Sequence, residues 1–225
     1  MADKQDQMPN LQDICNRYAM IHTGAISDVL DGMGYRNQAL PNRILPLTSD
    51  TKVAGPAFTG MGQVTIDVTN NDMPRRLEML KSIPPLSVSV WSTSGHLGAA
   101  HWGELMSTAA RNSGCTGAVI DGGVRDSHFL LRMGFPVFAS CHSVASSIGR
   151  WEILACQIPI SIGTVEIRPA DFVVGDIDGV VIVPQHCLLQ VLEKAEELRE
   201  REAKMRADID AGMDVEACFK KYGAM

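Results

Sequence analysis

The stretch that most constrains this chain runs from Gly114 to Asp126 and reads G-C-T-G-A-V-I-D-G-G-V-R-D. Its short apolar run, 118–120, is bounded by glycines, which is typical of a buried strand. The following Gly122-Gly123 pair predicts a sharp turn, at which the backbone can approach a ligand closely. The stretch therefore predicts a strand that ends beside a binding site.

Arg125 and Asp126 would lie at the end of this strand. The guanidinium of Arg125 is a planar fork suited to carboxylates, and the carboxylate of Asp126 is a hard oxygen ligand suited to a divalent cation. An Arg–Asp pair at a strand end is also compatible with an ordinary structural salt bridge. This stretch alone leaves both interpretations open.

Composition restricts the classes of protein to consider. A chain of 225 residues with 45% hydrophobic and 20% charged residues is typical of a folded globular protein. A net charge of −6 and the lack of a dense basic patch argue against a nucleic-acid partner. No apolar run has the length of a membrane span, so a membrane protein is not expected. Six scattered cysteines without a C-x-x-C pair favour free thiols and a cytoplasmic location.

Periodicity and turn signals predict alternating helices and strands. Helices are expected at 11–20, 23–33 with Thr23 as N-cap, 72–81 with Asn71 or Asp72 as cap, 103–112, 126–133 and 188–209. Strands are expected within 52–68, at 86–91, 118–120 and 136–139, and several within 158–183. Irregular segments are expected at 37–50, 92–101 and 141–151. No repeat or low-complexity linker divides the chain, so we expect one α/β domain over 1–225, with its core at about 20–185 and C-terminal helices at 186–225.

A second informative stretch is H-W-G-E-L-M, residues 101–106, where a loop leads into a helix at Gly103. The N-terminus of a helix presents unpaired N–H groups that bind carboxylates or developing oxyanions. This helix returns the chain directly into the predicted strand and must run antiparallel to it. Gly103 and Glu104 are therefore expected close to Arg125 and Asp126.

Together these residues predict one site with two halves. The helix amides and Arg125 would bind an anion, and Asp126 with Glu104 would hold Mg²⁺ or Mn²⁺. The substrate that fits both halves is a small 2-oxo acid. A metal and an arginine placed there would stabilise an enolate, which favours carbon–carbon cleavage or decarboxylation next to pyruvate.

The runs G-E-L-M, G-C-T-G-A-V-I-D-G-G-V-R-D, G-F-P-V-F-A and G-D-I-D-G-V-V-I-V-P resemble the RraA-like family. That family contains divalent-metal-dependent 4-hydroxy-4-methyl-2-oxoglutarate aldolases and regulators of ribonuclease activity A. The resemblance extends from about Ser27 to the C-terminal helix, and G-x-V-R-D is its most specific part. The aldolase signature is an Asp, twenty intervening residues and Arg-Asp; here Glu104 replaces the Asp, twenty residues before Arg125-Asp126.

The resemblance implies a role for each residue. Asp126 would bind the metal directly, Glu104 would bind it through water, and Arg125 would bind the pyruvyl carboxylate or oxygen. The amides that would assist Arg125 belong to Gly103, Glu104, Leu105 and Met106. The family's fold resembles the swivelling β/β/α domain of phosphohistidine proteins, and its members form homotrimers or homohexamers with sites between subunits. Glu202, in the C-terminal helix of the neighbouring subunit, is the candidate that completes the metal site.

The expected function is therefore that of a class II pyruvate aldolase. It would cleave a 4-hydroxy-2-oxo acid, such as 4-hydroxy-4-methyl-2-oxoglutarate, to pyruvate and a carbonyl product, with oxaloacetate decarboxylation as a further activity. The rival is a non-catalytic regulator that binds a ribonuclease, but such a protein has no need of both Glu104 and Asp126. A quinone methyltransferase is a third interpretation, against which the lack of a glycine-rich loop after the first strand argues. Among the histidines, His101 is the best placed for a catalytic role.

Overall fold

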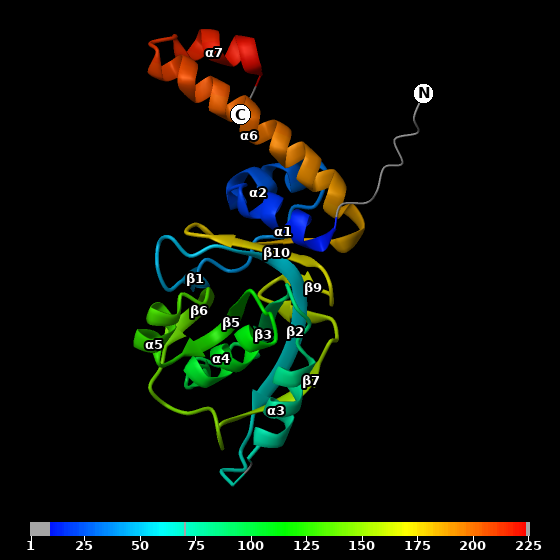
Figure 1. Cartoon of the computed structure of the whole chain (residues 1–225), viewed down its shortest axis with the longest axis vertical. Helices are drawn as coiled ribbons and strands as arrows, with labels where there is room; N and C mark the ends of the chain where they lie inside the picture. Colours follow the sequence, from blue (N-terminus) through cyan, green and yellow to red (C-terminus); the bar gives the residue numbers. More distant parts are fainter. Residues whose placement is uncertain (1–9, 70, 224–225) are drawn as a thin grey trace.

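The computed structural model describes residues 10–69 and 71–223 (Figure 1). Its helices are α1 (Leu11–Ala19), α2 (Thr23–Gly32), α3 (Met73–Ser82), α4 (Glu104–Asn112), α5 (Ser127–Met133), the 3₁₀ turn η1 (Gln185–Cys187), α6 (Leu188–Asp210) and α7 (Val215–Tyr222). Its strands are β1 (Leu45–Pro46), β2 (Val53–Val64), β3 (Val88–Ser92), β4 (Ala100–Trp102), β5 (Gly117–Val124), β6 (Val137–His142), β7 (Trp151–Cys156), β8 (Ile160–Ile162), β9 (Val165–Ile167), β10 (Phe172–Asp176) and β11 (Gly179–Val183).

Within the described residues, nine strands form one sheet in the order β1-β6-β5-β3-β2-β10-β11, with β4 beside β5 and β7 beside β2. Its centre is parallel, because β3 pairs in parallel with β2 and β5, and β5 pairs in parallel with β6. Central parallel strands need cover on both faces, and every residue of β3 and β5 is buried. The long strand β2 connects this parallel part to the antiparallel pair β10–β11.

The helices pack on the sheet in two groups. In Figure 1, α1, α2 and α6 lie together on one side of β10, whereas α3, α4 and α5 accompany the parallel strands on the other side. The first group buries apolar side chains such as Tyr18 and Leu192 against Phe172. The second group packs around Ile120 and Trp102. The α/β class and the C-terminal helical extension expected from the sequence are confirmed by this arrangement.

Strand β5 confirms the expected buried strand but corrects the turn expected at its end. The Gly122-Gly123 pair is not a turn, because β5 continues through both glycines to Val124. A Cβ on Gly122 would lie 2.5 Å from Nδ1 of His101, and a Cβ on Gly123 would collide with the backbone oxygen of Ala99. The glycines are needed because β4 and the loop before it approach the strand closely.

All six expected helices are confirmed, and the N-terminal capping of two of them differs from expectation. The N-cap of α2 is His22 rather than Thr23, since Nδ1 of His22 accepts the Ala25 amide at 3.1 Å. Thr23 is buried and donates through both N and Oγ1 to the carboxylate of Asp176, at 2.8 and 2.7 Å. The N-cap of α3 is Asp72, as expected, but its side chain makes no capping hydrogen bond.

One strand lies within a segment that was expected to be irregular, and two others begin in the last two residues of such segments. β4 begins at the end of the Ser-, Gly- and His-rich loop, β7 begins at Trp151, and β1 lies within the loop at 37–50. β1 and β7 pair with strands distant in sequence, and β4 has only three residues, so local periodicity gave little signal for them. No helix in the described part of the chain is both long enough and apolar enough to cross a membrane.

Candidate functional site

A cavity of about 250 Å³ opens at the carboxyl end of β5. One wall consists of Gly103, Leu105, Met106 and Ala109 at the start of α4, and the opposite wall is α3. Glu104 is not part of this lining. Arg125, Asp126 and the segment Ser146–Ile148 complete the lining. Ligands of α/β proteins commonly bind beyond the carboxyl ends of parallel strands, which makes this cavity the candidate site.

The structure brings the predicted residues together. The Glu104 amide donates to Oδ2 of Asp126 at 3.3 Å, although the two residues are 22 positions apart. The Arg125 amide donates to the carbonyl of Trp102 at 3.1 Å, which joins the end of β5 to the start of α4. The expected proximity of the helix start and the strand end is therefore observed.

Arg125 and Asp126 both reach solvent at the mouth of the cavity. Their side chains are 45% and 39% exposed, and Nε of Arg125 lies 3.6 Å from Oδ2 of Asp126. An exposed pair at this distance adds little to stability. Asp126 also adopts a left-handed backbone conformation with φ of 60°. Such conformations in non-glycine residues are uncommon and concentrate at functional sites.

Gly103 allows Asp126 to reach the helix start. A Cβ on Gly103 would lie 2.7 Å from Oδ2 of Asp126, so any larger residue would displace the carboxylate. Because Asp126 accepts the Glu104 amide, that donor is already engaged within the chain. An α-helix leaves its first N–H groups without helical partners, so Leu105 and Met106 are the further amides at this helix start.

Glu104 stands beside this pair on the first turn of α4. Its side chain is partly exposed, and Oε1 accepts a hydrogen bond from Oγ1 of Thr108 at 3.1 Å. Asp126 and Glu104 offer hard carboxylate oxygens, the ligand type that Mg²⁺ and Mn²⁺ prefer. The described residues contain no group of three or more His, Cys, Asp or Glu side chains arranged to hold a metal. The two carboxylates thus fit a divalent cation whose other ligands come from water, substrate or a second subunit.

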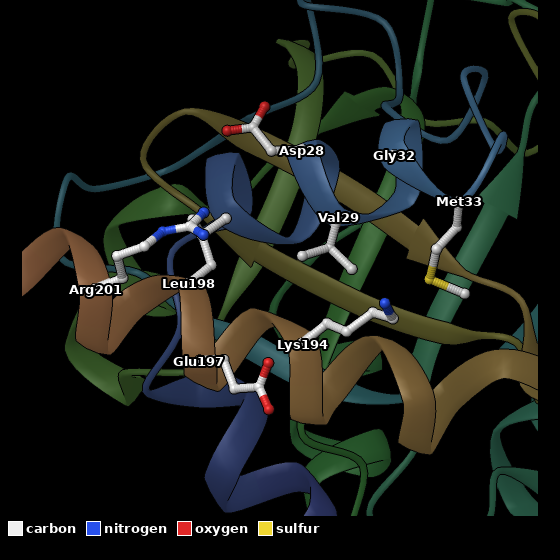
Figure 2. A pocket seen from close by; sticks show the side chains of 8 residues that line it. All are labelled: Asp28, Val29, Gly32, Met33, Lys194, Glu197, Leu198 and Arg201. Atoms are coloured by element: carbon white, nitrogen blue, oxygen red, sulfur yellow. The ribbon is translucent and has the colours of Figure 1, made fainter. Parts of the chain in front are cut away.

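Glu202 lies on α6, outside this cavity. Its Oε2 is 3.0 Å from Nε2 of His22, so within its own chain it is paired at the α2–α6 side of the molecule. A second cavity, of about 380 Å³, is lined by residues of α2 and α6 (Figure 2). Its walls carry side chains of both charges, from Asp28, Lys194, Glu197 and Arg201. In Figure 1 the helices α2 and α6 lie across β10 from α4.

His101 is buried at the base of the candidate site, with only 4% of its surface exposed. Its Nδ1 accepts the Gly123 amide at 3.2 Å, and its Nε2 lies 3.0 Å from Nδ1 of His96. Burial lowers its pKa from 6.5 to about 3, helped by the neighbouring charges of His96 and Arg76. His101 is therefore a neutral ring that carries its proton on Nε2, which suits a structural support better than a general base.

The buried neutral His101 predicts a loss of stability in mild acid. Because its folded-state pKa lies below its unfolded value, protons bind preferentially to the unfolded chain as the pH falls through 6.5. We expect this residue to reduce the free energy of unfolding by about 2 kcal/mol between pH 7.5 and pH 5. Urea unfolding at several pH values, monitored by tryptophan fluorescence, measures the effect.

His101→Asn is the matched control for this measurement. The amide oxygen of Asn can accept the Gly123 amide but does not titrate. The variant is expected to lose about 2 kcal/mol less than the wild type over the same pH interval. Equal pH dependence in both proteins would contradict the assignment of the acid sensitivity to His101.

Arg76 lies at the site but was not among the residues predicted from the sequence. It projects from α3, lines the cavity and is only 5% exposed. Its Nε donates to Oδ1 of Asp72 at 2.7 Å, and Cζ lies 5.6 Å from the centre of the Trp151 ring. The i,i+4 spacing of Asp72 and Arg76 was a visible signal for a helical ion pair. The burial of this ion pair depends on packing against β7, so it could not be predicted from the neighbouring residues in the sequence.

Comparison with known proteins places the chain in a family. The RraA-like family, described as Aldolase/RraA, matches residues 23–182. A protein of Halalkalibacterium halodurans named "Putative 4-hydroxy-4-methyl-2-oxoglutarate aldolase" is 33% identical over 210 residues, which cover 93% of this chain and 95% of that protein.

Two solved structures show the same fold. One, described as "Crystal structure of novel cellulases from microbes associated with the gut ecosystem", is 38% identical with a TM-score of 0.84, and the match covers 90% of each chain. The other is Streptomyces coelicolor RraAS2, described as an unusual member of the RNase ES inhibitor RraA protein family. It is 22% identical with a TM-score of 0.78, and the match covers 89% of this chain and 98% of that one. The fold expected from the resemblance is thus confirmed, and the chain belongs to the RraA-like family.

Proposed function

We propose that this protein is a divalent-metal-dependent lyase that cleaves a 4-hydroxy-2-oxo acid to pyruvate and a carbonyl product. The observation that carries the proposal is the meeting of Arg125, Asp126 and the start of α4 at the mouth of one cavity. This arrangement combines an anion-binding side chain, helix amides and hard carboxylates. The aldolase name of the Halalkalibacterium halodurans relative supports the same reaction class.

In this proposal Arg125 binds the pyruvyl end of the substrate. Its guanidinium donates to the carboxylate or the 2-oxo oxygen, and the amides of Leu105 and Met106 provide further donors. Loss of the proton from the C4 hydroxyl breaks the C3–C4 bond, whose electron pair passes towards the 2-oxo group. Arg125 stabilises the negative charge that develops there, and protonation of C3 then gives pyruvate.

Asp126 and Glu104 are the proposed metal-binding residues of this chain. Asp126 would bind the cation directly and Glu104 through water, since the carboxylate of Asp126 adjoins the helix start that carries Glu104. When bound, Mg²⁺ or Mn²⁺ supplies Lewis-acid stabilisation of the developing charge. In a homotrimer or homohexamer, Glu202 of a neighbouring subunit is our candidate for a further carboxylate.

Pyruvate release tests this function directly. We expect the purified protein with Mg²⁺ to release pyruvate from at least one 4-hydroxy-2-oxo acid, and also from oxaloacetate, in a lactate-dehydrogenase-coupled assay. Chelation with EDTA is expected to abolish the activity, and Mg²⁺ without protein is the blank for spontaneous decarboxylation.

No pyruvate above the metal-only blank from any of these acids would overturn the proposal. The rival is then a non-catalytic regulator of a ribonuclease. Calorimetric titration with oxalate, a pyruvate enolate analogue, separates the two because only an aldolase site needs metal-dependent oxalate binding.

A further inference from the structure

Arg76, a residue of the cavity wall, carries a hydrogen-bond donor that the proposed reaction does not use. Nη2 of Arg76 is buried and has no hydrogen-bond partner among the described residues. Buried polar groups are nearly always paired, and an unpaired one costs free energy, more so when it is charged. The contact with the face of Trp151 stabilises the charge of Arg76 but supplies no acceptor oxygen for this N–H group.

The charge of Arg76 is already balanced. Nε of Arg76 and Oδ1 of Asp72 are 2.7 Å apart, and the two side chains are only 6% and 4% exposed. Oδ2 of Asp72 accepts the Ile153 amide at 3.0 Å, so this carboxylate is held in place from β7. A second anion at Arg76 would lie near the Asp72 carboxylate in a desolvated site, which is unfavourable. The spare N–H therefore suits a neutral acceptor oxygen better than a carboxylate.

The rest of the α3 wall is apolar. Met73, Leu77 and Leu80 line it, and Met106 and Ala109 face it from α4. Methionine side chains are flexible and adapt to irregular shapes, so Met73 and Met106 allow the cavity beside Arg76 to adjust to a ligand. The cavity thus has a charged mouth at Arg125 and, along α3, an apolar wall in which Nη2 of Arg76 is an unpaired donor within the described part of the chain.

We propose that this interior binds the carbonyl-forming half of the substrate, and that Arg76 selects a chain carrying a neutral oxygen acceptor, such as a ketone. The inference rests on the proposed function, because the pyruvyl half is assigned to Arg125. It goes further in naming the substrate class: an apolar 4-hydroxy-2-oxo acid with a neutral oxygen near its far end, rather than one with a second carboxylate.

Three seven-carbon probes that lack the reactive 4-hydroxyl test this selection by binding alone. They are 2-oxoheptanoate, 2,6-dioxoheptanoate and 2-oxoheptanedioate, titrated by calorimetry into the purified protein with Mg²⁺. We expect the dioxo acid to bind about 10- to 100-fold more tightly than the alkyl acid, as a hydrogen bond to a charged donor allows. It is also expected to bind more tightly than the dicarboxylate.

Arg76→Lys keeps a cation beside Asp72 but removes the Nη2 donor, and it is expected to reduce the preference for the dioxo acid to less than threefold. Arg75→Lys is the matched control on the same helix, because Arg75 is exposed and bonds the Ile153 carbonyl outside the cavity. The Arg75→Lys variant should prefer the dioxo acid over the alkyl acid by the same factor as the wild type. Thermal unfolding measurements show whether both variants are folded. If Arg76→Lys does not fold, it is replaced by the double variant Arg76→Gln/Asp72→Asn, in which both partners of the ion pair are neutral.

The inference is overturned if the dioxo acid binds no better than the alkyl acid, if the dicarboxylate binds most tightly, if the preference survives in the Arg76 variant, or if none of the probes binds. These outcomes are separate from those of the pyruvate assay. If the protein releases no pyruvate but shows an Arg76-dependent preference for the dioxo acid, the proposed reaction is refuted and the proposed subsite is supported.

Discussion

Replacing Arg125 with alanine is expected to lower kcat/KM for pyruvate release by at least ~10³-fold, because one guanidinium both positions the pyruvyl group and stabilises the charge that develops on it. Its side chain is 45% exposed and pairs only loosely with Asp126, so its removal leaves no buried charge behind. The fold should therefore survive the substitution. Steady-state kinetics of pyruvate formation, with the unfolding temperature measured alongside, gives the result.

Two further variants show whether the loss of activity is specific to the guanidinium of Arg125. Arg125→Lys keeps the charge but loses the planar fork, and we expect it to recover only part of the lost activity. Arg111→Ala removes an exposed arginine from the last turn of α4 and is expected to retain wild-type kinetics. Activity of Arg125→Ala within tenfold of the wild type would mean that Arg125 and Asp126 form an ordinary salt bridge.

Replacing Asp126 with asparagine is expected to abolish activation by Mg²⁺ while leaving the fold intact. Asparagine tolerates a φ of 60° and can still accept the Glu104 amide, so the backbone and the helix start are preserved. What it loses is the negative charge that a hard cation requires. We expect a fall of at least ~10²-fold in kcat/KM at saturating Mg²⁺, since changing a residue that merely supports a metal ligand already costs about 10- to 100-fold.

Metal binding should be measured separately from activity for this variant. Calorimetric titration with Mn²⁺ is expected to detect binding to the wild type and none to Asp126→Asn. Asp13→Asn makes the same chemical change on α1, where the carboxylate is half exposed, and should bind Mn²⁺ as the wild type does. Unchanged metal affinity in Asp126→Asn would remove Asp126 from the metal site.

The location of the site follows from the topology of the sheet. β4, α4 and β5 form one continuous segment in which β4 pairs in parallel with β5, so the chain after β4 and the chain after β5 end at the same edge. At that edge, α3 and the segment Ser146–Ile148 form the other walls of the cavity. The proposed reaction therefore takes place where segments from four parts of the chain meet.

The sequence by itself determined the parts of the site that depend on local rules. The apolar run bounded by glycines predicted β5, and the loop before Gly103 predicted α4. A helix that leads directly into a strand runs antiparallel to it, and this rule alone placed Glu104 near Asp126. Helix periodicity likewise predicted most of α6.

Only the tertiary structure decided what depends on contacts between distant segments. Gly122 and Gly123 carried the signal of a turn, but they continue β5 because His101 and Ala99 pack against them. Arg76 lies in a helix that the sequence predicted, but its burial in the cavity wall depends on contacts such as that with Trp151 of β7. Periodicity reports the conformation of a segment, whereas burial and hydrogen bonding depend on which other segments pack against it, and that information is not local.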